Sequence, residues 1–264
     1  MRKLLVTLAV CGLSVAAMAA EKAAEPKDID FSFEQPLGGW DMDSVQRGFQ
    51  VYREVCSACH QLKYVAFRML TDIGFSEDQV QALASEYQIE TLDEYGDTTT
   101  RPGTPSDYFP SPFPNDVAAA AANNGRVPPN LSLIVEAREG GADYIYSLLT
   151  GYTEPPEGEE VEPGLYWNKY YPGHKIAMAQ PLYDDFVVYA DGTPATLEQT
   201  AKDVTAFLAW ASEPNMVERK RLGFSTILFL IFLTALFYMS YKKVWAPVKA
   251  GATPWKDLVE KQRK

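Results

Sequence analysis

The sequence has few of the side chains that bind metals or form crosslinks. Its 264 residues include three cysteines and two histidines. Three cysteines exclude a multi-disulfide scaffold, and two histidines exclude any protein site that needs three histidine ligands. Basic residues are also scarce, with 24 Lys and Arg against 35 Asp and Glu. The net charge of −11 argues against a nucleic-acid binder that works through a basic surface.

The chain begins with the three-part pattern of a secretory signal. Two basic residues precede an uncharged, mostly apolar run over residues 4–15, and Ala17 and Ala19 supply the small residues that favour cleavage. We therefore predict a signal peptide over residues 1–20, in preference to a retained membrane helix or a lipid attached at Cys11. Its removal leaves two cysteines in the mature chain.

A second uncharged run, residues 222–241, lies near the other end of the chain. A helix of this length is about 30 Å long, the thickness of the hydrocarbon core of a bilayer. Basic residues flank the run on both sides. We predict three parts after the signal: an exported domain over 21–217, one transmembrane helix with its flanks over 218–243, and a cytoplasmic tail over 244–264.

Charge is segregated along the chain. Residues 21–217 carry 32 acidic and 12 basic side chains, whereas residues 218–264 carry 3 acidic and 10 basic ones. The basic excess after the span fits the positive-inside rule. An acidic exported domain favours encounter with a basic protein partner.

Residues 56–60, with the sequence CSACH, form a C-x-x-C-H motif, the attachment pattern of c-type haem. Two thiols three positions apart can both reach one edge of a porphyrin, and the adjacent imidazole can bind the iron from the same turn. We therefore predict one haem c, held covalently by Cys56 and Cys59, with His60 as an axial iron ligand.

Other uses of this motif fit the sequence less well. Zinc would need two more cysteine or histidine ligands, and only His174 is left to supply one. A thiol–disulfide redox site is typical of a βαβ context, whereas the residues around the motif have a helical pattern. A structural disulfide is compatible with an exported domain and stays open as an alternative.

The motif does not fix the other axial position of the iron. His174 and Met178 lie close together far downstream. Methionine raises the potential and suits a carrier near the oxidising end of an electron-transfer chain, whereas a second histidine lowers it. Met178 follows a Pro-Gly turn and precedes Pro181, so its backbone is stiff and irregular, as a ligand loop requires. On this chemistry we favour Met178, with His174 and an open position as alternatives.

The hydrophobic pattern predicts a mainly α domain. A helix over 43–60 runs into the motif, and capping-box patterns at 76–79 and 196–199 open two further helices. We expect Asp116 to cap a short alanine-rich helix. Strand signals are weak, and the best of them is residues 186–193.

Three loop features each have a functional and a structural interpretation. Pro129 is rigid and could press an apolar wall against a porphyrin, or end a helix. Arg138 could bind a haem propionate, or pair with Glu136 or Glu139. The glutamate-rich loop over 153–164 could dock a basic protein, or be a solvated surface loop.

An ordered set of segments covers essentially the whole mature chain: RGFQVYREVCSACH, ANNGRVPPNLSLIVEAREGG with DYIYSLLTGY, NKYYPGHKIAMAQPLYDD, YADGTPAT, KDVTAFLAWASEP, and ERKR directly before the span. In this set the chain resembles the cytochrome c1 family, the haem subunits of the cytochrome bc1 complex. The resemblance implies a cytochrome c-like haem domain with long loop insertions. It also implies specific roles: Met178 as sixth iron ligand, His174 as its non-ligand neighbour, Arg138 at a propionate, Pro129 in the haem wall, and Gly48 with Tyr52 where the first helix crosses the last.

The resemblance further implies function and partners. Family members catalyse nothing alone, and relay single electrons from a Rieske iron–sulfur protein to a cytochrome c, beside cytochrome b, in a dimeric complex that oxidises quinol. Together with the export signal, it suggests a bacterial inner membrane with the haem domain on the periplasmic side. The alternatives are a free-standing membrane-anchored cytochrome c that serves a terminal oxidase, and a haem peroxidase or ligand sensor.

Overall fold

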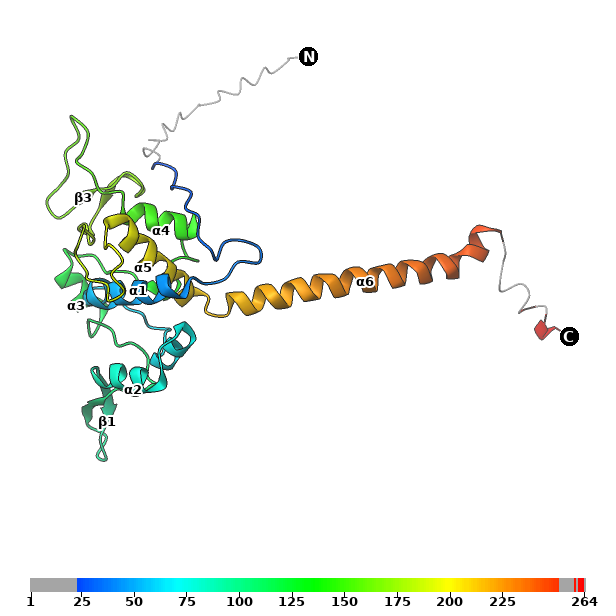
Figure 1. Ribbon diagram of the computed structural model, residues 1–264, viewed down its shortest axis with the longest axis horizontal. Coiled ribbons are helices and arrows are strands. Elements are labelled where there is room, and N and C mark those ends of the chain that lie inside the picture. Colours follow the sequence, from blue (N-terminus) through cyan, green and yellow to red (C-terminus); the bar gives the residue numbers. More distant parts are fainter. Residues whose placement is uncertain (1–22, 252–258, 260, 264) are drawn as a thin grey trace, which may run out of the picture.

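The computed structural model describes residues 23–251, 259 and 261–263, so the predicted signal peptide over 1–20 lies outside the described residues. Within them, a mainly helical head precedes one long helix that leaves it (Figure 1). The mainly α architecture predicted from the sequence is confirmed. The helices are α1 (Met42–Glu54), α2 (Glu77–Ser85), α3 (Asp116–Ala122), α4 (Gly141–Leu149), α5 (Leu197–Ser212) and α6 (Met216–Lys249), with the 3-10 turns η1 (Cys56–Ala58), η2 (Phe67–Ile73) and η3 (Leu131–Leu133).

The core of the head is the crossing of α1 and α5 (Figure 1). Gly48 of α1 is buried directly against the backbone of α5 at Asp203. One turn further along α1, the Tyr52 ring packs on the Phe207 ring with centroids 5.7 Å apart. The predicted crossing at Gly48 and Tyr52 is confirmed, because a residue without a side chain lets the two backbones touch.

A buried carboxylate ties the two helices together. The Asp203 side chain is fully buried and accepts hydrogen bonds from Arg47 Nε (2.9 Å), Ser44 Oγ (2.6 Å) and Gln199 Nε2 (3.0 Å). The hydrogen bond with Asp203 raises the pKa of Arg47 even though burial lowers it. These hydrogen bonds replace the water that the Asp203 carboxylate loses on burial.

Helix starts follow the predicted capping patterns at two of three positions. The Ser76 and Thr196 side chains each accept a hydrogen bond from the backbone N–H three residues later, at 3.2 Å in both cases. At α3 the prediction was wrong by one residue. Asn115 caps the helix by accepting from the Ala118 N–H at 2.9 Å, and Asp116 is the first helical residue. Both side chains can cap a helix, so the pattern alone did not separate them.

Strands in the described residues are two small antiparallel hairpins. The first pairs β1 (Gln88–Leu92) with β2 (Thr98–Pro102), and the second pairs β3 (Tyr166–Trp167) with β4 (Lys175–Ile176). Residues 186–193, the best of the weak strand signals, do not form a strand. Buried and exposed side chains do alternate there, but the Val188 carbonyl oxygen accepts from the Gln50 side chain (3.0 Å), and the backbone turns at Gly192, whose N–H donates to Tyr189.

Helix α6 projects from the head as a rod (Figure 1). Among the described residues it is the one helix long and apolar enough to cross a membrane, and the rest of the chain buries none of its most apolar window. A core helix would be covered, so we identify α6 as a membrane anchor. It starts before and ends after the predicted limits of 218–243. The limits of the span within α6 and the side on which the tail lies stay predictions.

Candidate functional site

The C-x-x-C-H motif forms one tight turn at the end of α1. The α-helix stops at Glu54, earlier than the sequence predicted, and η1 continues from Cys56. The backbone N–H groups of Cys59 and His60 both donate to the Cys56 carbonyl oxygen, at 3.1 and 2.9 Å. Two thiols and an imidazole therefore extend from a single turn of backbone.

Both thiols of the motif are free. Cys56 is half-buried against the hydrophobic core and Cys59 is exposed. The structural disulfide that the sequence left open is thus not formed between them. Burial, with a smaller contribution from Cys59, raises the pKa of the Cys56 thiol to about 12. The Cys56 thiol is therefore protonated at neutral pH, which makes it a poor nucleophile for thiol–disulfide exchange.

The His60 ring is oriented by a backbone carbonyl. Its Nδ1 lies 2.9 Å from the carbonyl oxygen of Pro129. A carbonyl can only accept, so Nδ1 carries the proton and Nε2 keeps its lone pair for a metal. Burial lowers the pKa of His60, which holds the ring neutral at physiological pH, although the bond to Pro129 opposes this. Tyr52 Oη donates to the His60 carbonyl oxygen (3.3 Å), which links the ligand turn to the helix crossing.

The segment that carries Pro129 is itself held against the residues that follow His60. Asn130 Oδ1 accepts from the Ser132 N–H (3.0 Å) and caps η3. The Ser132 hydroxyl accepts from the Tyr64 N–H (3.0 Å), and the Leu131 N–H donates to the Gln61 carbonyl (2.9 Å). No pattern in the sequence analysis above singled out Asn130 or Ser132 as part of the site. An asparagine directly after two prolines is a helix-cap signal that could have identified Asn130.

Met178 lies in irregular backbone after β4, as the sequence predicted. Its side chain is half-buried and packs against the same hydrophobic core as Cys56. Its carbonyl oxygen accepts a hydrogen bond from Tyr152 Oη at 3.0 Å. The backbone at Met178 is therefore tethered to the loop after α4, while the thioether carries no proton and can donate a lone pair to iron.

His174, the other candidate ligand, is held in the β3–β4 hairpin by contacts of its ring and backbone. It is buried, its ring stacks on Trp167 at 5.0 Å and 15°, and its Nδ1 lies 3.3 Å from the Asn168 carbonyl oxygen. Its own carbonyl oxygen accepts from the Asn168 N–H at 2.7 Å. These contacts give His174 a structural role in shaping the loop that leads to Met178.

Arg138 is exposed beside the start of α4. Its Nη1 donates to the Ala137 carbonyl oxygen at 3.2 Å, and its positive charge lowers the pKa of Tyr144, which burial raises more strongly. Among the ion pairs of the described residues, none joins Arg138 to Glu136 or Glu139. The guanidinium is thus free to bind an anionic group.

The donor set fits a covalent haem and does not fit a metal held by protein ligands alone. In the part of the chain that the structure describes, no group of three His, Cys, Asp or Glu side chains could hold a metal ion. Two unpaired thiols on one turn, a neutral imidazole with a free Nε2 and a half-buried thioether match the bonds that a c-type haem makes.

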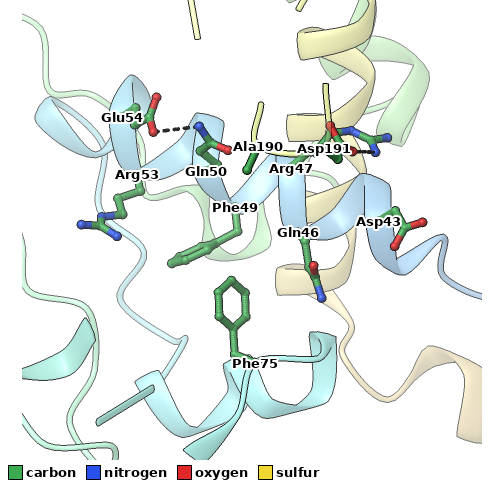
Figure 2. Close-up of a pocket in the computed structure, with 10 residues that line it drawn as sticks. All are labelled: Asp43, Gln46, Arg47, Phe49, Gln50, Arg53, Glu54, Phe75, Ala190 and Asp191. Atoms are coloured by element: carbon green, nitrogen blue, oxygen red, sulfur yellow. Dashed lines mark hydrogen bonds and ion pairs between the residues drawn. The ribbon is translucent and has the colours of Figure 1, made fainter. Parts of the chain in front are cut away.

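A pocket of about 510 Å³ beside α1 is a weaker candidate (Figure 2). Phe49 and Phe75 face one another across it with ring centroids 5.5 Å apart. Its charged and amide side chains already have partners: Arg47 pairs with Asp191 (2.9 Å) and Gln50 with Glu54 (2.9 Å). Several of the polar groups that could bind a ligand there are therefore already engaged within the protein.

Comparisons with known proteins identify the family of the chain. Residues 31–248 match the model of the Cytochrome C1 family. The chain is 53% identical over 222 residues to a mitochondrial cytochrome c1 heme protein of Schizosaccharomyces pombe, covering 83% of this chain and 72% of that protein. It is 47% identical over 257 residues to cytochrome c1 of Rhodospirillum rubrum, covering 91% and 94%.

A cytochrome b/c1 protein of Bradyrhizobium diazoefficiens is 47% identical over 253 residues, which is 87% of this chain but 37% of that longer protein. The matches to the other two relatives extend over most of both chains, and the residues matched by the family model include the motif turn, the Met178 loop and nearly all of α6. The chain therefore belongs to the cytochrome C1 family.

Proposed function

We propose that the chain is a one-electron carrier, a monohaem cytochrome c1 that acts as the electron-transfer subunit of a quinol–cytochrome c reductase and catalyses nothing alone. The observation that carries the proposal is the 2.9 Å contact between His60 Nδ1 and the Pro129 carbonyl oxygen. It leaves a neutral imidazole with a free Nε2 on the same turn as two unpaired thiols. Family membership favours this reading over a free-standing cytochrome c.

Six residues hold the cofactor in this proposal. Cys56 and Cys59 would form the thioether bonds, His60 and Met178 would bind the iron, Arg138 would bind a propionate, and Pro129 would form part of the haem wall. The haem c, when bound, supplies an iron that alternates between the ferrous and ferric states. Met178 favours the ferrous state because a thioether is neutral and soft. His60 keeps its orientation in both states because the Pro129 carbonyl fixes its proton on Nδ1.

The electron path follows from the family. A Rieske iron–sulfur protein is the donor, a cytochrome c is the acceptor, and cytochrome b completes a complex that we infer to be dimeric. The exposed glutamates of the 153–164 loop suit a basic acceptor, since opposite charges speed the encounter of two proteins. We place the chain in a bacterial inner membrane with the head on the periplasmic side.

Purification from membranes tests the assignment. The full chain, with an affinity tag at its C-terminus, is extracted in mild detergent and captured. We expect cytochrome b and a Rieske protein to copurify and the preparation to reduce cytochrome c with quinol. The double variant Cys56→Ala/Cys59→Ala is the control and should lose covalent haem. A haem-loaded chain that purifies without either partner would instead be the free-standing carrier.

A further inference from the structure

A compact loop between the N-terminal segment and α1 projects from the head on the side from which α6 leaves (Figure 1). The Gly38 N–H donates to the Gln35 carbonyl oxygen at 2.9 Å, and the Ser32 hydroxyl donates to the Gly39 carbonyl oxygen at 2.9 Å. These bonds close a turn over residues 35–38, and Pro36 at its second position restricts the backbone. The loop is therefore a rigid projection.

The turn presents one apolar side chain to solvent. Leu37 is 76% exposed, whereas Phe33 at the base of the loop is 7% exposed. The Phe33 ring packs between Phe31 and Trp40, with centroids 5.0 and 4.9 Å away. The base is thus part of the core, and it holds Leu37 away from the protein at the tip.

The loop contacts α6 just before its uncharged run, and the predicted span places this level at the membrane surface. Lys220 Nζ donates to the carbonyl oxygens of Phe33 and Gln35, the second at 2.7 Å, and a Cβ atom on Gly39 would lie 3.7 Å from Val217. The uncharged run begins at residue 222. At about 1.5 Å per residue along the helix axis, Lys220 lies roughly 3 Å and Val217 roughly 7.5 Å before that point. The headgroup layer of one leaflet is roughly 5–8 Å thick, so the loop lies beside it.

We propose that the 35–38 turn inserts Leu37 into the headgroup–acyl boundary of the leaflet nearest the head, as a second contact of the head with the lipid bilayer. The contact would extend the lipid-facing surface of α6, which the described residues leave uncovered. A protein partner would need a surface complementary to the turn. Fluid lipid needs none, so a single apolar side chain at the tip of a turn is better suited to a lipid contact. Two contacts fix the tilt of the head, which one helix alone would leave free.

A fluorescent label at position 37 tests the proposal in the full, haem-loaded chain. Leu37→Cys is labelled with NBD and reconstituted in phosphatidylcholine nanodiscs. Val117→Cys is the matched control, because Val117 is also apolar and 80% exposed but belongs to α3, on the side of the head away from α6 (Figure 1). We expect emission at position 37 to move to shorter wavelength and to be quenched severalfold more by lipids brominated near the headgroup than emission at position 117.

Two outcomes would overturn the proposal. One is equal emission and equal quenching at both positions. The other is a shift at position 37 that appears only in the complete complex and resists brominated lipid, because a protein subunit would then cover Leu37. The wild-type chain, labelled in parallel, should take up no NBD. Uptake there would contradict the thioether bonds of the proposed function, and the membrane contact would still be read from the difference between labelled variant and wild type.

Discussion

A Cβ atom on Gly48 would lie 2.0 Å from the carbonyl oxygen of Asp203 and 2.7 Å from the Cβ of Phe207. The backbone of α1 therefore rests directly on α5. Because the motif turn follows α1 without a flexible connection, this contact sets the position of Cys56 and His60 relative to the rest of the head.

Gly48→Ala is expected to push α1 away from α5. The obstacle is backbone, which cannot move aside as a flexible side chain can, so we expect the free energy of unfolding to fall by about 3 kcal/mol. Guanidinium unfolding of the full chain in detergent, followed by near-ultraviolet circular dichroism, measures it. Gly223→Ala is the control, since a Cβ there meets no atom within 4 Å. Equal stability of the two variants would contradict the close crossing.

Removal of the buried carboxylate should also destabilise the crossing. Asp203→Ala leaves the Arg47 guanidinium, whose side chain is 16% exposed, without its main partner. Loss of one member of a buried ion pair costs about 3–5 kcal/mol. Asp191→Ala removes the second, exposed partner of Arg47 and should have a much smaller effect. The same unfolding measurement distinguishes the two variants. A larger loss of stability in Asp191→Ala would show that the buried contact between Arg47 and Asp203 is not what holds α1 against α5.

Acid should weaken the base of the β1–β2 hairpin. Asp107 accepts from Arg101 (2.6 Å) and from the Thr104 N–H (2.8 Å), and the Arg101 hydrogen bond holds its pKa well below the ordinary value. A carboxylate whose pKa is lower in the folded state contributes stability above its unfolded pKa of about 3.9. That stability is lost as pH falls further.

Hydrogen exchange of the Thr104 amide measures this effect. We expect protection relative to core amides to fall between about pH 4 and pH 2, and to be low at every pH in Asp107→Asn. Asp72→Asn, an exposed aspartate on η2, should behave as wild type. Protection of Thr104 that is independent of pH in the wild-type chain would contradict the role of Asp107.

Charge on the 153–164 loop should affect the encounter with a basic cytochrome c. Glu159→Gln/Glu160→Gln is expected to lower the association rate at low ionic strength on the order of threefold and to flatten its salt dependence. The matched control Glu90→Gln/Glu94→Gln removes the same charge from the β1–β2 hairpin, at the opposite end of the head (Figure 1). Stopped-flow oxidation of the reduced chain gives both rates. Equal slowing would assign the effect to net charge, not to this loop.

Much of the fold and of the candidate site could be predicted from local sequence patterns. The C-x-x-C-H turn, the glycine at the crossing and the uncharged run of α6 are each visible within a few residues of sequence. The contact from His60 to Pro129 is not, because it joins residues 69 positions apart through a backbone carbonyl. No side-chain pattern encodes which carbonyl faces a histidine.

The strands show the same limit. Residues 186–193 alternate as a strand does, but pairing needs a partner strand, and the Val188 carbonyl oxygen is bound by the side chain of Gln50 in α1 instead. The β1–β2 hairpin has mostly exposed, polar strands, so the hydrophobic alternation that signals a strand is missing. Its Tyr95-Gly96-Asp97 turn, where Gly96 has φ +85°, was the available signal.

The identity of the sixth iron ligand decides whether the chain is an electron carrier or an open, ligand-binding haem protein. Met178→Leu keeps the volume of the side chain but removes the sulfur, so we expect a lower midpoint potential and slower reduction by the iron–sulfur partner. His174→Gln should retain the potential of the wild type, because His174 is held by Trp167 and Asn168. Redox titration of both variants separates these effects.

The most direct test is the near-infrared absorption spectrum of the oxidised, haem-loaded full chain. We expect a sulfur-to-iron charge-transfer band in the wild type and in His174→Gln, and its loss in Met178→Leu. Absence of the band from the wild type, or its persistence in Met178→Leu, would contradict ligation of the iron by Met178.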